Sequence, residues 1–253
     1  MIYGVNGNLK MKLIEDIIES LKGKDVKIKN VYVGVFWTIV ESLHGGLAST
    51  LVDKSHEHHH IADAGHLTEK NANELIKKAL SSSLLDSSIG LATINSLLDV
   101  DEKWITEINA ADILFEKAKD KNCAIIGHFP FINKLEKEAK NLWTIEMYPR
   151  EKDLTVEEGW EVLPLAEVVG ITGTTLINKT LDGIISSCPN AFKVMIGPTT
   201  PLTPILFDYG LDVISGSIVT STEKILPYIQ EGASFRQIHP HGVKLVTMTK
   251  EKI

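Results

Sequence analysis

The stretch AIIGHFP, residues 124–130, decides the fold of the second half because it joins a short apolar run to a loop of turn-forming residues. An apolar run of this length, followed at once by glycine and proline, is typical of a buried strand that ends in a turn. A helical pattern follows over residues 131–140. The stretch therefore predicts a strand–loop–helix unit, the repeating unit of an α/β sheet.

The same rhythm continues toward the end of the chain. Further apolar runs predict strands at residues 142–147, 168–172, 193–196, 212–214 and 243–248, and helical patterns lie near residues 175–187, 202–209 and 223–230. Strands that are apolar throughout are expected where helices cover both faces of a parallel sheet. Residues 109–253 are therefore predicted to form a Rossmann-like, mostly parallel α/β domain, in which ligands bind beyond the carboxyl ends of the strands.

The first half of the chain has a different pattern. An amphipathic helix is predicted to end near Gly23, and three short strands are predicted at residues 26–28, 31–40 and 47–52, with Gly45-Gly46 as the turn before the last. Strands this close in sequence can only be antiparallel. Helices are predicted around residues 75–80 and 84–98. All nine prolines lie at or after Pro130, which supports a boundary, and residues 1–108 are predicted to form a small α+β domain.

Charge and composition narrow the class of protein. The formal net charge is -7 at pH 7, and lysines alternate with acids instead of forming a basic stripe, which argues against nucleic acid as a partner. No stretch approaches the roughly 20 apolar residues of a membrane span, and the N-terminus carries no signal-peptide core. The two cysteines, Cys123 and Cys188, lie in separate elements, which indicates reduced, structural thiols. We expect a cytoplasmic protein that forms a homo-oligomer, a homodimer by base rate.

Polar side chains follow the predicted strands. His128 follows the first of them, Glu146 lies at the end of the second, and Arg150 comes just beyond. Thr172 closes the third strand. Because the carboxyl ends of parallel strands meet at one edge of a sheet, a titratable cluster there is the default site hypothesis. The simpler alternative is that His128 caps the following helix and that Glu146 pairs with Arg150 on the surface.

The loop Gly127–Pro130 stands where a dinucleotide fold has its glycine-rich phosphate turn. It lacks the second and third glycines that let a pyrophosphate approach the backbone. Glu146 does follow about 20 residues on, where such folds place the acid that binds the ribose hydroxyls. An ordinary NAD site is therefore not expected, whereas a nucleoside-containing cofactor is left open.

Two further segments suit an anion. The segment GPTTP, residues 197–201, is predicted to end a strand and open a helix. Its backbone N–H groups and the hydroxyls of Thr199 and Thr200 would then suit an oxyanion, although Pro198 removes a donor. Asn178-Lys179-Thr180 is predicted to lie one turn inside the helix after Thr172, with Lys179 either reaching a bound anion or solvated.

The most conspicuous string of the first half is His56-Glu57-His58-His59-His60. Neutral imidazoles are ligands for divalent transition metals, and His56, His58 and His60 concentrate them in one short segment. The string is not the HExxH arrangement, which places two ligands on one helix face beside a general base. A promiscuous metal-binding loop and a solvated polar loop are both open. His239-Pro240-His241 carries the same ambiguity with fewer ligands.

Three motifs resemble a known family: SIGLATIN at residues 88–95, GHFP at 127–130 and GPTTPLTP at 197–204. The sequence is similar to uncharacterised prokaryotic proteins of the "putative heavy-metal chelation" family over most of its length, most weakly before Ala62. The resemblance implies a first domain similar to the enolase N-terminal fold, followed by a Rossmann-like domain, with a site where the two meet. The histidine string is not part of the family pattern.

The resemblance also implies roles for particular residues. Asn95 would offer a donor and an acceptor to a ligand, and His128 and Glu146 would be the metal ligands, alone or through a bound organic chelator. The full predicted ligand-binding set is Asn95, Gly127, His128, Glu146, Thr172, Asn178, Lys179, Pro198, Thr199 and Thr200.

Three functions follow from the sequence. The first is metal handling, in which the interdomain cleft binds a divalent transition metal or a small anionic metal-binding ligand. The second is an enzyme that uses a nucleoside-containing cofactor, with Glu146 on the ribose and His128 as acid or base. The third is a non-catalytic small-molecule sensor on the same fold, because fold alone does not settle function.

Overall fold

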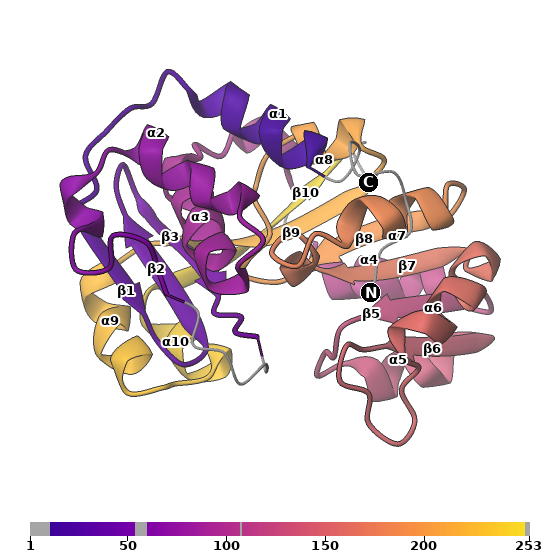
Figure 1. Ribbon diagram of the computed structural model, residues 1–253. Helices are drawn as coiled ribbons and strands as arrows, with labels where there is room; N and C mark the ends of the chain where they lie inside the picture. The colour runs from indigo at the N-terminus through magenta and orange to yellow at the C-terminus, as the bar shows by residue number, and fades with distance from the viewer. Residues whose placement is uncertain (1–10, 54–59, 107, 251–253) are drawn as a thin grey trace.

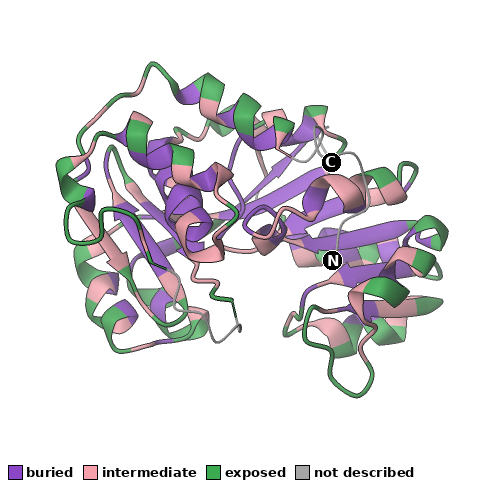
Figure 2. Ribbon diagram, viewed as in Figure 1, coloured by how far each residue is buried: buried purple, intermediate pink, exposed green. Residues whose placement is uncertain are grey.

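A computed structural model describes residues 11–53, 60–106 and 108–250, and within these residues one ten-stranded sheet runs through both halves of the chain. The strands follow the order β1-β2-β3-β9-β8-β7-β5-β6, with β10 paired to β9 and to β4 off this path. Most of these strands are buried, whereas the outer faces of the helices are exposed (Figures 1 and 2). The predicted α/β class with a largely parallel sheet is confirmed.

The first half contributes the antiparallel end of the sheet. β1, β2 and β3 pair in sequence order, and α3 packs across β2 and β3. Gly90 of α3 permits this packing, because a Cβ there would lie 1.8 Å from the backbone nitrogen of Ala79. The elements are α1 (Lys12–Leu21), β1 (Asn30–Val33), β2 (Trp37–Glu41), β3 (Gly45–Ser49), α2 (Ala72–Leu75) and α3 (Leu84–Leu97).

Three expectations for the first half are corrected by the structure. Residues 26–28 form no strand, and Lys27 makes only an isolated bridge to Asn71. The run 31–40 is two strands, β1 and β2, because the chain turns between them. Gly45-Gly46 lie inside β3 rather than in the turn before it. Gly46 is required there by close packing, since a Cβ would lie 2.1 Å from the carbonyl oxygen of Ala92.

The second half contributes the parallel part of the sheet. β5, β6, β7, β8 and β9 are mutually parallel, and β10 returns antiparallel to β9. The elements are β4 (Ile105–Thr106), α4 (Ala110–Ala118), β5 (Asn122–Ile126), α5 (Ile132–Glu138), β6 (Asn141–Ile145), α6 (Val156–Val162), β7 (Val168–Thr172), α7 (Leu181–Ser187), β8 (Phe192–Ile196), α8 (Ile205–Asp208), β9 (Val213–Val219), α9 (Thr222–Gln230), α10 (Phe235–Gly242) and β10 (Val243–Thr249).

Each predicted strand of the second half is present, but several helices differ from expectation. α4, α6 and α10 were not predicted, and α8 is a single turn that begins only at Ile205. The strand predicted at residues 212–214 continues as β9 to Val219, so Ser215-Gly216-Ser217 lie inside a strand rather than after it. Gly216 is small because the loop after β8 crosses it, with the carbonyl oxygen of Thr200 only 2.4 Å from where a Cβ would stand.

The two halves share their core at the antiparallel end of the sheet. Val40 and Ala48 belong to the cluster that contains α3, whereas Ile39 and Leu47 belong to a second cluster with residues of α9 and α10. α9 and α10 therefore lie beside β1 and β2 although they come from the end of the chain (Figure 1). The two halves share one sheet. The division into residues 1–108 and 109–253 stays a prediction, and so does the likeness to the enolase N-terminal fold.

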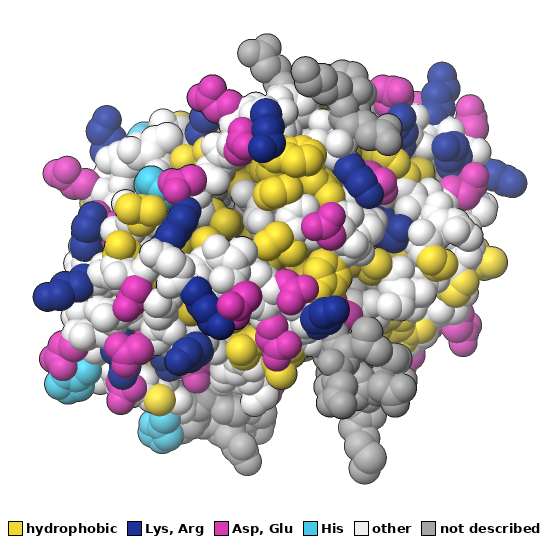
Figure 3. Space-filling model, turned by 90° about the horizontal axis from the view of Figure 1, so that it is seen from above, with side chains coloured by type: hydrophobic (Ala, Val, Ile, Leu, Met, Phe, Trp, Pro, Cys, Tyr) yellow, Lys and Arg dark blue, Asp and Glu magenta, His cyan; other side chains and the backbone are white. Residues whose placement is uncertain are grey.

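The surface seen from above mixes charges of both signs. Lysine and arginine side chains alternate with acidic ones over the described residues of this face, and apolar side chains gather near its centre (Figure 3). Helices long and apolar enough to cross a membrane are absent from residues 11–53, 60–106 and 108–250.

Candidate functional site

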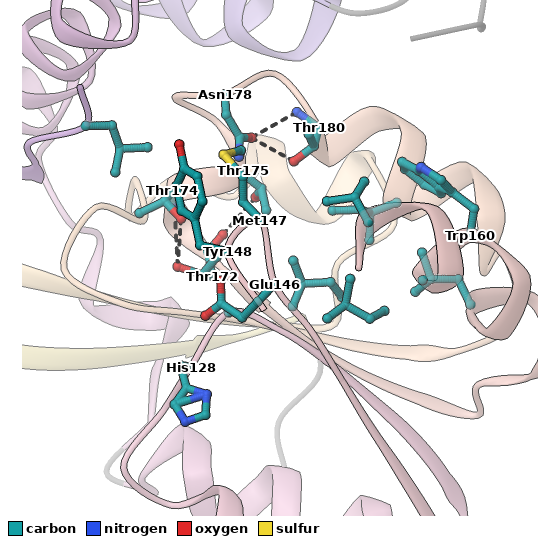
Figure 4. A pocket seen from close by; sticks show the side chains of 18 residues that line it. His128, Glu146, Met147, Tyr148, Trp160, Thr172, Thr174, Thr175, Asn178 and Thr180 are labelled. Atoms are coloured by element: carbon teal, nitrogen blue, oxygen red, sulfur yellow. Dashed lines mark hydrogen bonds between the residues drawn. The ribbon is translucent and has the colours of Figure 1, made fainter. Parts of the chain in front are cut away.

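A cavity of about 250 Å³ lies at the carboxyl ends of β5, β6 and β7 (Figure 4). This β5–β7 cavity is the place where a Rossmann-like sheet is expected to bind a ligand. The residues that line it are Leu51, Ile126, Gly127, His128, Ile145, Glu146, Met147, Tyr148, Val156, Gly159, Trp160, Leu163, Thr172, Thr174, Thr175, Asn178, Thr180 and Ile184.

His128 and Glu146 line the same cavity because the strands that they follow run side by side. Ile126 and Ile145 are paired in the parallel register of β5 and β6, so the residues that follow them leave the sheet together. Gly127 makes the turn after β5 with a φ of 101°, a conformation that side chains rarely adopt. The sequence prediction that His128 and Glu146 share one sheet edge is therefore in keeping with the geometry (Figure 4).

Asp153 joins these two residues and was missed in the sequence. Its Oδ2 lies 4.0 Å from Nδ1 of His128 and accepts a hydrogen bond from the backbone N–H of Arg150 at 3.0 Å. Burial raises the pKa of the Glu146 carboxyl, the nearby His128 opposes that rise, and the charge of Asp153 reinforces it. Arg150 is exposed, and the ion pairs between described residues include none that joins it to Glu146.

Neutral polar groups from the end of β7 and the segment after it form one wall of the cavity. The hydroxyls of Thr172 and Thr174 lie 3.1 Å apart, and the hydroxyl of Thr175 donates to the carbonyl of Thr172 at 2.7 Å. The hydroxyl of Thr180 donates to Oδ1 of Asn178, also at 2.7 Å. Thr172 and Asn178, both predicted from sequence, thus line the same cavity as His128 and Glu146.

An apolar wall closes the other end. It is built by α6 and the residues around it, with Trp160 and Val156 from α6 and Ile184 from α7. Gly159 lets α6 approach β6, since a Cβ would lie 2.6 Å from Cγ2 of Ile145. α6 has a sequence signal in its capping box, in which Thr155 and Glu158 exchange hydrogen bonds with each other's backbone N–H. Reading that box would have predicted α6 and with it Trp160.

Among the described residues of the first half, Leu51 alone lines the β5–β7 cavity. Asn95, expected to face the same ligand, instead donates through Nδ2 to the carbonyls of Leu47 at 2.8 Å and Thr199 at 3.1 Å. Its Oδ1 is buried and has no hydrogen-bond partner among the described residues. Asn95 lines a separate cavity of about 260 Å³ between α3 and β9, whose other lining residues include His44 and Asp99, with Nε2 of His44 2.8 Å from Oδ1 of Asp99.

The loop after β8 joins the two halves instead of opening a helix. Thr199 Oγ1 accepts from the backbone N–H of Ser49 at 2.9 Å and donates to its hydroxyl at 3.0 Å. Thr200 is buried and its hydroxyl has no partner among the described residues. Pro198 accepts a hydrogen bond from Ser217 through its carbonyl. Because α8 begins only at Ile205, the expected helix N-terminus beside Thr199 and Thr200 is not there.

Lys179 is neither solvated nor directed into the β5–β7 cavity. It lies in a turn before α7, not inside a helix, with a φ of 61°. Its Nζ donates to the carbonyl of Ala79, to the hydroxyl of Ser87 at 2.7 Å and to the carbonyl of Leu176 at 3.2 Å. Burial lowers the pKa of Lys179 to about 8. Both sequence expectations for this side chain are therefore wrong.

The histidine string contributes little to the described structure. His56 and His58 lie outside the described residues, and His60 is exposed. Cys123 and Cys188 are buried free thiols, and burial raises the pKa of Cys123 to about 12 and that of Cys188 to about 11. Within residues 11–53, 60–106 and 108–250, no group of three or more His, Cys, Asp or Glu side chains could hold a metal ion.

Two sequence profiles match the chain, and both carry the description "Putative heavy-metal chelation". One matches residues 14–98 and the other residues 109–248. An uncharacterized protein from Methanocaldococcus jannaschii is 30% identical over 199 residues, which cover 75% of this chain and 75% of that protein.

Two crystal structures of proteins of unknown function have the same fold. The protein from Desulfitobacterium hafniense aligns with a TM-score of 0.81 at 24% identity, covering 97% of this chain and 100% of the other. The protein from Pyrococcus horikoshii aligns with a TM-score of 0.78 at 20% identity, covering 95% of this chain and 99% of the other.

Proposed function

This chain belongs to the family described as "Putative heavy-metal chelation", and we propose that it handles a divalent transition metal at the His128–Glu146 end of the β5–β7 cavity. The metal arrives as the ion or as its complex with a small anionic chelator. The observation that carries the proposal is that His128 and Glu146, which follow the paired strands β5 and β6, line the same cavity, with Asp153 Oδ2 4.0 Å from His128 Nδ1.

The chemistry of these donors fits the proposal in part. A neutral imidazole and carboxylates are suitable ligands for zinc, nickel, copper and iron. The chain offers fewer than a complete set, because the described residues contain no group of three or more that could hold a metal ion. An external ligand would therefore complete the coordination. The buried thiols are poor candidates, because a protonated thiol does not bind metal.

The proposal is tested by titrating metal-stripped protein with Zn²⁺, Ni²⁺ and Cu²⁺ in a calorimeter. We expect His128→Ala and Glu146→Gln each to lower the affinity at least tenfold, the usual effect of removing one metal ligand or its support. The matched control is Glu161→Gln, an exposed acid on α6. A triple variant of His56, His58 and His60 to Gln separates the histidine string from the cavity. If that triple variant alone abolishes binding, the site is the string and the proposal fails.

A second candidate, an enzyme with a nucleoside-containing cofactor, rests on the place of Glu146 directly after β6. An acid in that place binds ribose hydroxyls in Rossmann-like folds. Native mass spectrometry of protein taken directly from cells would detect such a cofactor. Its consistent absence, with no thermal shift across nucleosides and nucleotides, would leave metal handling or a non-catalytic sensor.

Unchanged ligand after long incubation with the protein would favour the non-catalytic sensor over an enzyme. Light scattering would test the expected homodimer.

A further inference from the structure

The β5–β7 cavity has two chemically different ends. Trp160 lies at one end and His128 lies at the other (Figure 4). Glu146 lies between Trp160 and His128, on the side of His128 (Figure 4). A ligand that fills the cavity must therefore carry an apolar part toward Trp160 and a polar part toward Glu146 and His128.

The charge of the lining is one-sided. Lys and Arg are absent from the described residues that line the cavity, whereas Glu146 brings a carboxyl group. Asp153 adds a second acid next to His128. The amine of Lys179, which lies between the lining residues Asn178 and Thr180, donates to the carbonyl of Ala79 and the hydroxyl of Ser87. The cavity is thus electrostatically suited to positive charge.

The neutral polar groups do not reverse this preference. The N–H of Glu158 at the start of α6 is taken by the hydroxyl of Thr155, and the N–H of Thr155 is taken by the Glu158 carboxylate. The hydroxyls of Thr175 and Thr180 donate within the protein. An incoming phosphate or carboxylate would lose its water shell without meeting a Lys or Arg side chain in the described lining, and it would face the carboxyl of Glu146, which is costly.

We infer that the β5–β7 cavity takes a small molecule that presents positive charge to Glu146 and an apolar body to Trp160. The positive charge comes either from an organic amine or from a divalent metal held by an aromatic chelator. Only the second source rests on the proposed function. A free anionic chelator meets like charge at Glu146, so the cavity accepts it only after the metal has offset its charge.

Three probes of similar shape test the charge preference. Benzylamine, benzyl alcohol and benzoate are cationic, neutral and anionic, and their affinities are compared by calorimetry. We expect the cation to bind about tenfold more tightly than the neutral probe, the effect of one partly desolvated charge pair. Benzoate is expected to bind most weakly. Equal or tighter binding of benzoate, or no binding of any probe up to its solubility limit, would overturn the inference.

Two variants locate the effect. Glu146→Gln is expected to bring the benzylamine affinity down to that of benzyl alcohol, while Glu161→Gln, on the exposed face of α6, leaves the ranking unchanged. Trp160→Leu is expected to weaken all three probes without changing their order. Circular dichroism checks that each variant is folded. An unchanged ranking in Glu146→Gln would mean that the probes bind elsewhere, and the inference would fall.

Bipyridine with and without Zn²⁺ separates the two sources of charge. Tighter binding of the zinc complex than of free bipyridine supports the metal source. If metal titration of the protein fails but benzylamine still binds with dependence on Glu146, the proposed function fails and the inference stands. If metal binds at His128 and benzoate equals benzylamine, the proposed function stands and the inference fails.

Discussion

Lys179 Nζ donates a hydrogen bond to Ser87 Oγ over 2.7 Å, and this bond joins the turn beside the β5–β7 cavity to α3 of the first half. The neighbours of Lys179 in sequence, Asn178 and Thr180, both line the cavity. The amine is thus a link between the position of α3 and the shape of the cavity wall.

The link predicts a particular dependence of stability on pH. Burial lowers the pKa of Lys179 to about 8, whereas an unfolded lysine has a pKa of about 10.4. Between these values the unfolded state binds more protons, so the free energy of unfolding rises with pH. We expect wild type to gain roughly 2 to 3 kcal/mol relative to Lys179→Met over this window, from urea unfolding at each pH. Lys22→Met, at an exposed site, is the control. A flat difference between wild type and Lys179→Met would contradict the prediction.

Glu146 predicts the opposite slope at acidic pH. Burial raises its pKa above the ordinary value for glutamate, so the folded state holds its proton more tightly and loses stability as pH rises through that window. Glu146→Gln removes the titration. We expect the variant to gain stability relative to wild type from acidic to neutral pH, measured by thermal unfolding in matched buffers. A wild type that gains on the variant over this range would show that the carboxylate is stabilised in the fold.

Gly90 predicts a failure of packing rather than of chemistry. A Cβ there would lie 1.8 Å from the Ala79 nitrogen, and Gly90 and Ala79 are both buried. Gly90→Ala should cost at least about 3 kcal/mol or prevent folding, as severe overpacking does. Gly23→Ala, with nothing within 4 Å of the new Cβ, should change stability by less than about 0.5 kcal/mol. Equal behaviour of the two variants in chemical denaturation would refute the packing account.

Asn95 is predicted to act on stability alone. Its Nδ2 donates to the carbonyls of Leu47 and Thr199, so Asn95→Ala leaves two buried acceptors without this donor, at a cost of about 2 kcal/mol. Thr199→Val, which removes the bonds to Ser49, tests the same junction. The affinity of the β5–β7 cavity for benzylamine should stay within about threefold of wild type in both variants, provided that they fold. A larger loss would place Asn95 in the ligand site after all.

The two cysteines are predicted to be chemically silent. Burial raises the pKa of Cys123 to about 12 and of Cys188 to about 11, so the thiolate needed for alkylation or metal binding is scarce at neutral pH. Iodoacetamide should label neither residue in native protein and both in urea, as mass spectrometry would show. Metal affinity should be unchanged in the double variant Cys123→Ser, Cys188→Ser. Loss of metal binding there would redirect the site to the thiols.

The sequence predicts the strand ends well because their signals are local. An apolar run followed by Gly127 places His128 beyond a strand, and parallel pairing then brings Glu146 to the same edge without further information. Asn95 and Thr199 could not be placed in this way. Their side chains are used at the contact between α3, β3 and the loop after β8, and such contacts depend on tertiary packing that no local pattern records.

Other misses have separate causes. Ser215-Gly216-Ser217 has the composition of a turn, but small residues are needed in mid-strand because the loop that carries Thr200 crosses there. Lys179 adopts a left-handed backbone, which its residue type does not announce. Trp160 was within reach, since the Thr155–Glu158 capping box marks the start of α6.

The return of α9 and α10 to the first half has a consequence for synthesis on the ribosome. Ile39 and Leu47 pack against residues of these late helices, among them Ile225 and Ile238. The nascent chain therefore emerges with one apolar face of β2 and β3 uncovered, and that face stays open until α9 and α10 have been translated. A chain that ends before Thr222 lacks both helices and exposes this apolar sheet face, which favours aggregation.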